Sequence, residues 1–536
     1  MLIRPLNKKL AIIDATNQEK LNIRRSCVNV TTSGNNLILE DNLFNRKFLD
    51  YHPEDLYFQY PLELYMDDDI NPKARDYQRN DILRMLVLKN VFNRNKPGYG
   101  KTFEAIEYCR ILGLKKILVI CPKSVVPQWK KQFAQWWPEV DQDVQMGGLG
   151  PERGERVIYV TNYEQLTPRC IGHQGRRKIL KPSQVWQRCK MWRWDLIVLD
   201  ESHRIKNASA QISVAVKDLP AEHRMCLSGT PILNHPDDLW SQLQFLDPRW
   251  SGNNYWAFVQ RFCEIEKSHF GQKPIGLTPS DSARDLLGKV LASISVGGDN
   301  QSVTEGKNYI KIDIPMTTEQ KKLYKAIVDL ALDSLEEQGI TVKNAMDQIV
   351  KQQQVTTNCC KFINENNGKV VCPTNPKFEW IRDWLEDNEG EPLVVFTKFA
   401  EAAKALSEWL AKNKIQNALF IGEMLGKERL KAKEQFVQHS AACRVLIGTI
   451  GAMGTGVDEL QYVCSNVVFL DRDWTPGINE QAEDRVNRSG AKNGMTNIWI
   501  LNAEKSIDEH VEDIQGKKAE DIEEVFKRVS NSVRSW

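Results

Sequence analysis

Short apolar runs recur along the chain, and longer amphipathic stretches separate them. A first set lies at residues 116–122, 156–162, 195–201 and 224–231. A second set begins near residue 378 and lies at 392–398, 417–423, 444–450, 466–472 and 496–502. Runs of this length between helical patterns are typical of buried strands in parallel sheets. The pattern therefore predicts an α/β fold with two parallel-sheet lobes.

The remaining pattern predicts the flanking regions. Residues 1–70 alternate short apolar runs with polar turns, which predicts a few short strands. Residues 317–338 have the spacing of a charged amphipathic helix, and the segment from 249 to 300 is expected to be helical and irregular. We therefore expect an N-terminal accessory region (1–70), a first lobe with a helical extension (71–300), a helical protrusion or linker (301–376), a second lobe (377–515) and a C-terminal helical tail (516–536).

Composition narrows the class of protein. The chain of 536 residues is 41% hydrophobic and 26% charged, as in a globular protein. No apolar run approaches the ~20 residues that span a bilayer, and the N-terminus lacks the apolar core of a secretory signal. We expect a protein that is not secreted, in the cytoplasm of a bacterial or virus-infected cell or in a nucleus. Because the net charge is only +2, any nucleic-acid contact must come from local patches.

The twelve cysteines are scattered and form no CxxC pair. Neither a zinc ribbon nor a disulfide framework is therefore predicted. Reduced structural cysteines are the favoured interpretation. Two groups could instead hold a metal: Cys359 and Cys360 with Cys372, or Cys170 with His173 and Cys189.

A glycine-rich segment opens a predicted helix shortly before the first apolar run. Gly98 and Gly100 let the backbone turn tightly and approach a phosphate, and the helix N-terminus favours anionic oxygens. Lys101 could neutralise phosphate charge, and the Thr102 hydroxyl could bind Mg²⁺. Asn95 replaces the first glycine of the full phosphate-loop pattern. The alternative is an ordinary glycine turn before a helix.

The apolar run at 195–201 ends in two carboxylates, Asp200 and Glu201. The carboxyl end of a parallel strand lies at the crevice where ligands bind. Asp200 would hold Mg²⁺, and Glu201 would orient and deprotonate the attacking water in a phosphoryl-transfer reaction. The alternative is a solvated charge cluster at a strand end, and the lysine loop upstream makes it the weaker interpretation.

These motifs, with those around them, closely resemble the SNF2-like branch of the superfamily-2 motors over residues 72–515. The wording leans toward the distant annealing-helicase subgroup. The matching stretches are 74–78 (Q motif), 121–133 (Ia), 160–166 (Ib), 200–203 (II), 227–234 (III), 393–399 (IV), 447–460 (V) and 473–490 (VI). The resemblance implies two RecA-like lobes with helical insertions, and ATP and Mg²⁺ as cofactors. It also implies that Gln78 and Gln481 contact ATP, and that His203, Ser228 and Thr230 couple the nucleotide state to movement.

Arg485 and Arg488 lie three residues apart, on one face if the segment is helical. The resemblance implies that both are catalytic arginine fingers that reach across an interlobe cleft to the γ-phosphate. Such a group can contribute about 10³–10⁵ in rate. The alternative is that both pair with local acids such as Glu483 and Asp484.

Three departures from the family pattern indicate a divergent member. Asn95, Lys96 and Pro97 stand where an acidic pair usually precedes the glycine loop. Residues 293–300 stand roughly where a basic RRxK element is expected, and Ala491 replaces a glutamine after motif VI. The catalytic set itself is intact.

The resemblance implies that both lobes grip one strand of a DNA duplex. Contacts with phosphates, which position a protein without reading sequence, are expected from Lys123, Ser124, Trp129, Asn162, Lys398 and Thr449. A basic insert adds to them, because eight Lys or Arg residues and no acid lie between Glu164 and Asp195, interleaved with Trp186, Trp192 and Trp194. We hypothesise that Arg176, Arg177, Lys178 and Lys181 contact DNA, with a merely solvated basic loop as the alternative.

The sequence thus predicts an ATP hydrolase that moves along double-stranded or branched DNA as a monomeric motor without a membrane partner. Annealing or fork remodelling would be a specialised form of this activity. One alternative is a strand-separating or branch-migrating helicase of replication, recombination or repair. Another is a DNA-binding scaffold with weak ATPase activity. Chromatin remodelling ranks lower, because no histone-reading appendage is evident.

Overall fold

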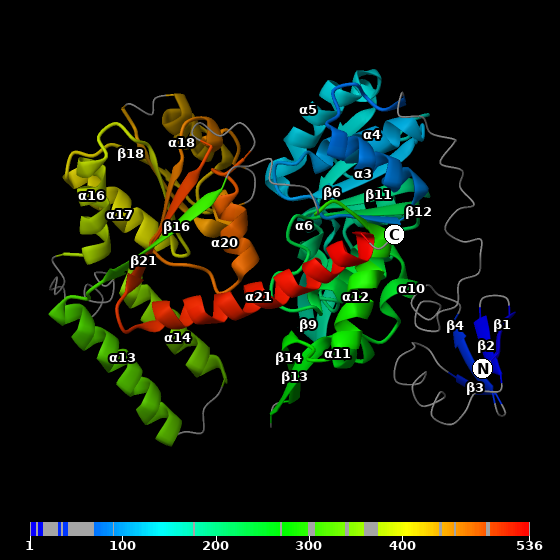
Figure 1. Cartoon of the computed structure of the whole chain (residues 1–536). Helices are drawn as coiled ribbons and strands as arrows, with labels where there is room; N and C mark the ends of the chain where they lie inside the picture. The colour runs from blue at the N-terminus through cyan, green and yellow to red at the C-terminus, as the bar shows by residue number, and fades with distance from the viewer. Residues whose placement is uncertain are drawn as a thin grey trace. The chain divides into compact units, whose positions relative to one another are not determined.

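The computed structural model divides the chain into two compact units (Figure 1), one formed by residues 1–300 with 520–536 and the other by residues 301–519. The described residues are 2–6, 9–13, 31–33, 36–40, 69–88, 90–174, 177–268, 271–298, 306–337, 342–358, 374–438, 442–454, 457–488 and 494–534. Among the helices in these ranges, none is both long and apolar enough to cross a bilayer.

The N-terminal region contains a four-stranded antiparallel sheet of order β1-β2-β4-β3. Its strands are β1 (Leu2–Leu6), β2 (Lys9–Ile13), β3 (Thr31–Ser33) and β4 (Asn36–Glu40). The prediction of short strands in this region is confirmed, whereas a further run at 21–25 lies outside the described residues.

A seven-stranded parallel sheet of order β15-β5-β12-β11-β6-β8-β7 forms the centre of the first unit. Its strands are β5 (Asn90–Asn93), β6 (Lys116–Cys121), β7 (Val144–Met146), β8 (Val157–Asn162), β11 (Trp194–Asp200), β12 (Ala221–Leu227) and β15 (Ser295–Val296). The inner strands are buried along most of their length, as their apolar runs predicted.

Two layers of helices cover this sheet. One face packs against α3 (Asp76–Val87), α4 (Lys101–Ile111) and α5 (Val126–Trp136), through side chains such as Ile82, Ile106 and Phe133. The other face packs against α7 (Gln184–Lys190), α8 (Gln211–Lys217), α9 (Asp238–Leu246), α11 (Tyr255–Phe262) and α12 (Asp281–Ile294). Short helices α6 (Tyr163–Leu166) and α10 (Pro248–Ser251) link the strands and helices of this unit.

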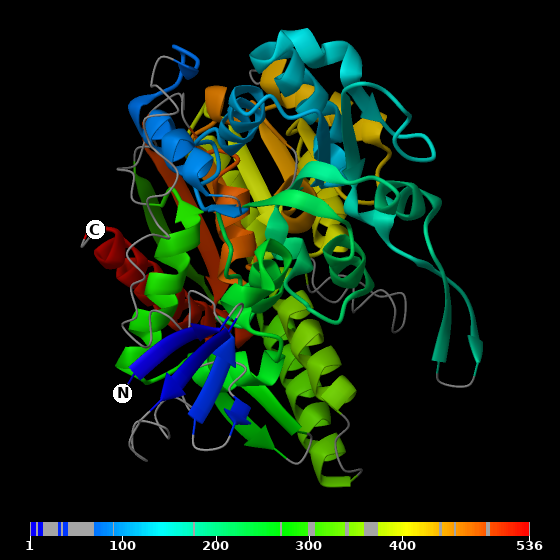
Figure 2. The same cartoon turned by 90° about the vertical axis from the view of Figure 1, so that its right-hand side faces the viewer.

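Two antiparallel hairpins interrupt the alternation of strands and helices. The first joins β9 (Arg169–Gln174) to β10 (Arg177–Lys181) and extends away from the main sheet of its unit (Figure 2). The second joins β13 (Cys263–Ser268) to β14 (Gly271–Leu277). The segment beyond residue 248, expected to be helical and irregular, therefore contains a hairpin between α11 and α12.

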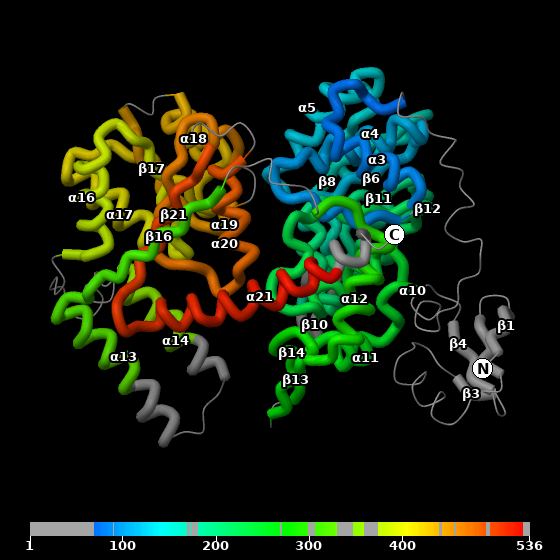
Figure 3. The backbone as a smooth tube through the Cα atoms, in the orientation of Figure 1, coloured from blue at the N-terminus to red at the C-terminus, as the bar shows by residue number. Residues whose placement is uncertain are grey.

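The second unit contains a six-stranded parallel sheet of order β16-β21-β20-β17-β19-β18. Its strands are β16 (Lys307–Ile314), β17 (Leu393–Thr397), β18 (Asn417–Phe420), β19 (Val445–Thr449), β20 (Asn466–Phe469) and β21 (Thr496–Ala503). β16 runs beside β21 at the sheet's edge (Figure 3). The fold prediction of two parallel-sheet lobes is confirmed.

Helices cover both faces of the second sheet. One face packs against α16 (Pro376–Asp387) and α17 (Ala400–Lys412), and the other packs against α18 (Gly426–Gln438), α19 (Ile450–Met453) and α20 (Pro476–Glu483). The helices α13 (Thr318–Glu337) and α14 (Val342–Thr357) contact each other. The final helix, α21, spans Ile507–Arg534.

Two boundaries differ from the expected ones. The region 301–376, expected to be a helical linker, begins with β16, a strand of the second sheet. The tail from residue 520 belongs to the first unit, where Val525 is 1% exposed and joins the core. Arg528 pairs there with Asp281 and Asp285 of α12.

Candidate functional site

The predicted motifs of the first unit lie along one edge of its sheet. The lysine loop follows β5, the acidic pair ends β11 and motif III follows β12, three strands that are neighbours in the sheet. Because all strands are parallel, their carboxyl ends share one edge, which is where α/β proteins bind ligands. The topology therefore brings together residues that lie far apart in the sequence.

The lysine loop needs both of its glycines. Gly98 and Gly100 have φ angles of 83° and 87°, a region that favours glycine. A Cβ on Gly100 would lie 2.4 Å from Gln78 Nε2. That amide donates to Tyr99 O at 3.0 Å, and its Oε1 accepts from Arg75 N at 3.0 Å. Gln78, expected to contact ATP, thus bonds to the loop through Tyr99 O and is 7% exposed.

Lys101 begins α4 and turns back onto its own loop. Its Nζ donates to Asn95 O at 2.6 Å and to Lys96 O at 3.2 Å. Thr102 follows in the first turn and is partly exposed. The loop, the helix N-terminus and the ammonium together form a cradle suited to phosphate oxygens.

The acidic pair lies at the end of β11. Trp129 Nε1 donates to Asp200 Oδ2 at 2.8 Å, and Tyr163 Oη donates to Asp200 O at 2.8 Å. Burial and the neighbouring Glu201 raise the pKa of Asp200 to about 6, while Trp129 and Lys101 oppose that rise. Glu201 has a φ of 54°, unusual for a residue with a side chain, so local contacts must hold the turn.

The three residues expected to couple nucleotide state to movement lie together. His203 Nδ1 is 3.4 Å from Glu201 Oε2 and 3.2 Å from Ser228 Oγ, which accepts from Thr230 N at 3.2 Å. Burial lowers the pKa of His203, so the neutral ring is favoured. These contacts connect the end of β11 to the loop after β12.

That loop also approaches the lysine loop closely. At Gly229 a Cβ would lie 2.5 Å from Pro97 Cδ, so only glycine fits there without a shift. Pro97, which replaces part of the family's acidic pair, therefore forms a packing contact with motif III.

Two residues expected at the DNA surface are instead structural. Trp129 is 1% exposed and its indole N–H bonds to Asp200, which leaves no group to contact a phosphate. Asn162 is 7% exposed, and its Oδ1 accepts from Gln165 N at 2.9 Å as the cap of α6. Motif position predicted a DNA contact for both; burial and the bond to Asp200 contradict it for Trp129, whereas for Asn162 the structure shows only that Oδ1 serves as the cap. Lys123 and Ser124, by contrast, are exposed between β6 and α5.

In the second unit, Arg485 and Arg488 converge on one acid that sequence reasoning did not single out. Both guanidinium groups pair with Asp458 in the loop after α19, and Arg485 Nε also donates to Gly454 O at 3.0 Å. Gln481, on the preceding helix, is 5% exposed.

The acids proposed as alternative partners of these arginines have other contacts. Glu483 accepts from Lys307, Tyr309 and Arg472, and Asp484 pairs with Lys307 at 2.7 Å. The local-pair alternative named the wrong acids, and it could not foresee β16, which supplies Lys307 and Tyr309 from far along the chain.

The DNA candidates of this unit lie at the carboxyl edge of its sheet. Lys398 follows β17; its backbone N–H donates to Asp471 at 2.8 Å and its Nζ lies 3.5 Å from Asp473 Oδ2. Thr449 ends β19 and is 9% exposed. The Lys398 ammonium is therefore partly neutralised by Asp473, and it is less available to a DNA phosphate than the sequence implied.

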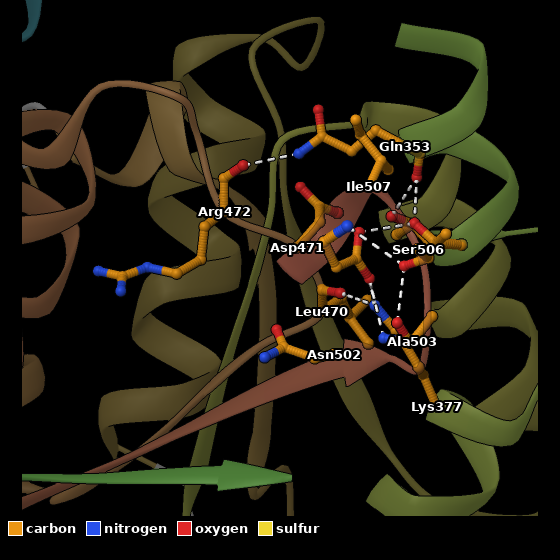
Figure 4. A network of polar contacts seen from close by, with 12 residues as sticks. Gln353, Lys377, Leu470, Asp471, Arg472, Asn502, Ala503, Ser506 and Ile507 are labelled. Atoms are coloured by element: carbon orange, nitrogen blue, oxygen red, sulfur yellow. Dashed lines mark hydrogen bonds and ion pairs between the residues drawn. The ribbon is translucent and has the colours of Figure 1, made fainter. Parts of the chain in front are cut away.

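A buried polar network crosses the same unit (Figure 4). Lys377, 2% exposed, donates to Leu470 O at 2.6 Å and to Asp508 Oδ2 at 2.8 Å. Burial raises the pKa of Asp471 to about 6, and Gln353 donates to Arg472 O at 2.8 Å. Contacts of this kind tie α14, α16 and α21 to the end of β20. Sequence reasoning missed this network, because its members share no motif.

The basic insert contains the β9–β10 hairpin and α7. Arg177 and Lys178 lie in β10, opposite Gln174 and His173, and Arg176 lies outside the described residues. The tryptophans of the insert pack inward: Trp194 is fully buried, and Trp186 and Trp192 pack against the same core. All three form core contacts, and Lys190 of the insert lies over the Trp186 ring, with its Nζ 4.9 Å from the ring centroid.

No group of three or more His, Cys, Asp or Glu side chains among the described residues is arranged to hold a metal. Cys189 is buried. Cys359, Cys360 and Cys372 lie outside the described residues, and so do the side chains of Cys170 and His173.

Comparison with known proteins places the chain in a family. The model of the SNF2-related domain matches residues 10–365, and that of the helicase conserved C-terminal domain matches residues 376–490. An uncharacterized ATP-dependent helicase of Mycoplasma genitalium is 24% identical over 88% of this chain and 44% of its own length. An ISWI chromatin-remodeling complex ATPase of Saccharomyces cerevisiae is 22% identical over 82% of this chain and 40% of its own length.

The chain therefore spans less than half the length of these curated relatives. Among solved structures, the SWI2/SNF2 ATPase core of Sulfolobus solfataricus in complex with dsDNA covers 88% of this chain and 98% of its own, at 21% identity and a TM-score of 0.38. The match to the SNF2-related domain extends over more than half of the chain, in the region where the lysine loop and the acidic pair lie. The chain therefore belongs to the SNF2-related family of helicase-like, ATP-dependent hydrolases.

Proposed function

We propose that the protein is an ATP-dependent translocase that moves along double-stranded DNA. One observation carries the proposal: the lysine loop and the acidic pair lie at the same edge of one sheet, close enough for the charge of Lys101 to act on the Asp200 carboxyl. A loop that cradles phosphates beside a carboxylate pair is the arrangement that phosphoryl transfer needs.

The residues of the first unit have separate roles in ATP binding and hydrolysis. The amides of the loop and Lys101 bind the phosphates of ATP, and Glu201 orients the attacking water. Thr102 and Asp200 would hold Mg²⁺, which supplies charge neutralisation at the phosphates when bound. Their donor set fits, because both offer hard oxygens and because Glu201 already crowds the Asp200 carboxyl with negative charge that a cation would offset.

Arg485 and Arg488 are proposed to stabilise charge on the transferred phosphoryl group, with Gln481 beside them. Their shared partner Asp458 supports this role, since a guanidinium fixed by a carboxylate is already oriented before it meets a phosphate.

DNA is proposed to contact Lys123 and Ser124 in the first unit, Lys398 and Thr449 in the second, and the β9–β10 hairpin. Lys123 and Ser124 are supported by their exposure directly before α5, the helix whose Trp129 bonds to Asp200. A DNA phosphate that contacts this end of α5 would shift the helix and, through Trp129, the position of the Asp200 carboxylate.

ATP turnover measured with duplex, single-stranded, forked and RNA ligands tests the proposal. Duplex DNA should raise turnover most, Lys101→Ala should abolish it, and Glu201→Gln should keep ATP binding but lose hydrolysis. Lys96→Ala is the matched control, because it changes an exposed lysine of the same loop and keeps the carbonyl that Lys101 contacts. A turnover that ignores duplex DNA, or survives Lys101→Ala, would contradict the proposal.

Displacement assays separate the translocase from its rivals. A translocase releases a triplex-forming strand and leaves the duplex paired, whereas a strand-separating or branch-migrating helicase opens the duplex. A scaffold with weak ATPase activity binds DNA and displaces neither strand.

A further inference from the structure

The segment through which the chain leaves the first unit lies against the lysine loop. β15 pairs in parallel with β5, at Phe92 and Asn93, directly before the loop. Arg94 N donates to Val296 O at 2.9 Å. The chain leaves the first unit only a few residues later, after residue 300. We call residues 295–297 the exit segment.

Arg94 fastens the start of the loop to this exit segment. Its side chain is 6% exposed. Its Nε donates to Ser295 Oγ at 2.8 Å, and its Nη2 donates to Gly297 O at 3.0 Å. A buried guanidinium with two such bonds is held in one orientation, because losing either bond would leave a charged donor unsatisfied.

Asn95 is anchored even more completely. It is 1% exposed, and its Nδ2 donates to Asp81 Oδ2 at 2.8 Å and to both Glu104 oxygens at 3.1 and 3.0 Å. Asp81 also accepts from Gly297 N at 3.2 Å. One half-buried carboxylate, Asp81, therefore accepts hydrogen bonds from both the asparagine of the loop and the exit segment.

The exit segment also leaves room only for glycine. At Gly297, where φ is +77°, a Cβ would lie 2.3 Å from Asn95 Oδ1 and 2.9 Å from Asn95 N. Two departures from the family pattern, the asparagine before the glycine loop and Gly297 within the sequence 293–300, thus meet in space. Each fits the other.

We propose that Asn95 is a positioning residue for Lys101, and that Gly297 holds Asn95 in place, so that the exit segment forms the underside of the phosphate loop. The step from Asn95 to the lysine is direct, because Asn95 O accepts from Lys101 Nζ at 2.6 Å. The inference rests on the proposed function, since it assigns Lys101 to ATP. The inference adds that ATP binding changes the conformation of the exit segment, where the chain leaves the first unit for the second.

A double-mutant cycle on the full chain tests the positioning role, read out as affinity for a fluorescent ATP analogue with Mg²⁺. Gly297→Ala and Asn95→Ala should each weaken binding by about tenfold or more. Gly297→Ala should cost less in the Asn95→Ala background than on its own, because the closest clash, with Asn95 Oδ1, is then removed and only the approach of 2.9 Å to Asn95 N remains.

Gly113→Ala is the matched control, because Gly113 has a φ of +60° but a Cβ there would meet nothing within 4 Å. It imposes backbone strain of the same kind, and we expect affinity to change less than about twofold. A Gly297→Ala effect as small as that of Gly113→Ala, or strictly additive effects of Gly297→Ala and Asn95→Ala, would overturn the inference.

Hydrogen exchange on the unaltered chain is a second test, and its result does not depend on whether any variant folds. Adding the analogue should slow exchange in peptides covering 95–105 and, together with them, 290–298, with no change in the β13–β14 hairpin. Slowing at 95–105 alone would overturn the inference but leave the proposed function standing. No slowing at 95–105, and no binding by the unaltered chain, would defeat both.

Discussion

Trp129 Nε1 donates a hydrogen bond to Asp200 Oδ2 at 2.8 Å, from a side chain that is 1% exposed. The indole therefore fixes the carboxylate proposed to hold Mg²⁺, and it does so from α5, the helix that follows the exposed Lys123 and Ser124. A tryptophan expected to contact DNA links the candidate DNA surface to the acidic pair.

Trp129→Phe should therefore impair hydrolysis without removing ATP binding. The change keeps an aromatic ring in the core and deletes one bond to a charged group, worth about 1.5–3 kcal/mol, so we expect turnover to fall by about ten- to a hundredfold. The Mg²⁺ concentration at half-maximal turnover should rise as well. Steady-state turnover against Mg²⁺, with melting temperature as a check on folding, measures both.

Trp136→Phe is the control on the same helix, because the Trp136 N–H donates to Gln132 and not to the acidic pair. It should leave the Mg²⁺ dependence unchanged. Equal effects of the two substitutions would mean that Trp129 contributes only packing.

Neutralising the β9–β10 hairpin should weaken DNA binding in a salt-dependent way. If Arg176, Arg177, Lys178 and Lys181 all contact phosphates, replacing them with glutamine should lower the slope of log affinity against log salt by about three to four. Binding titrations with duplex DNA at several salt concentrations measure the slope. Neutralising Lys267 and Lys273, which are exposed on the other hairpin of this unit, should leave it unchanged. A slope that does not move would favour a solvated basic loop.

Glu104→Gln should flatten the pH dependence of stability. Burial, with Asp81 nearby, raises the pKa of Glu104 to about 8 in the folded chain, above its ordinary value of 4.5. The neutral carboxyl thus contributes stability that is fully present below pH 4.5 and is lost as the pH rises through about 8. The melting temperature of the variant relative to the unaltered chain should rise between pH 5 and 8. Glu152→Gln, on an exposed loop, controls for the loss of one carboxylate. A difference that is constant across this range would contradict the prediction.

Lys377→Met should destabilise the protein strongly. It leaves Asp508 as a buried carboxylate without its ammonium partner, a loss of about 3–5 kcal/mol in comparable buried pairs. Chemical denaturation measures the change. Lys404→Met is the exposed counterpart, because Lys404 pairs with Glu401 and Glu423 at the surface, and it should melt close to the unaltered chain. Adding Asp508→Asn should recover part of the loss, and a further loss instead would show that the charge pair is not the cause.

The strands that the sequence predicted are those with continuous apolar runs. β6, β8, β11, β17 and β19 are buried along nearly their whole length, so the run and the strand coincide. β5 escaped prediction because it has only two apolar residues, between two asparagines. β16 escaped because, at the edge of its sheet, it alternates exposed and half-buried positions and resembles a polar linker.

The candidate site shows the same division. Lys101, Asp200, Glu201 and the two arginines could be chosen from motifs, since their chemistry and spacing are local. Their partners could not be chosen in this way. Asp458 reaches the arginines from the loop after α19, and Gly297 meets Asn95 across some 200 positions of sequence. Contacts of this kind depend on tertiary packing, which periodicity does not encode. Trp129 was misplaced for that reason, because a motif gives a position and not its burial.

The return of residues 520–534 to the first unit imposes an order on biosynthesis. Val525 belongs to a core whose other members precede residue 295, so the whole second unit is made between them. When the first parallel sheet has been synthesised, Val525, which completes the apolar core of that unit, has not yet been made. Because domains tend to fold as units while they are synthesised, this one must wait with part of its interior open until about 220 more residues have emerged. A nascent chain halted between the two would expose apolar surface, which makes it a natural client for chaperones.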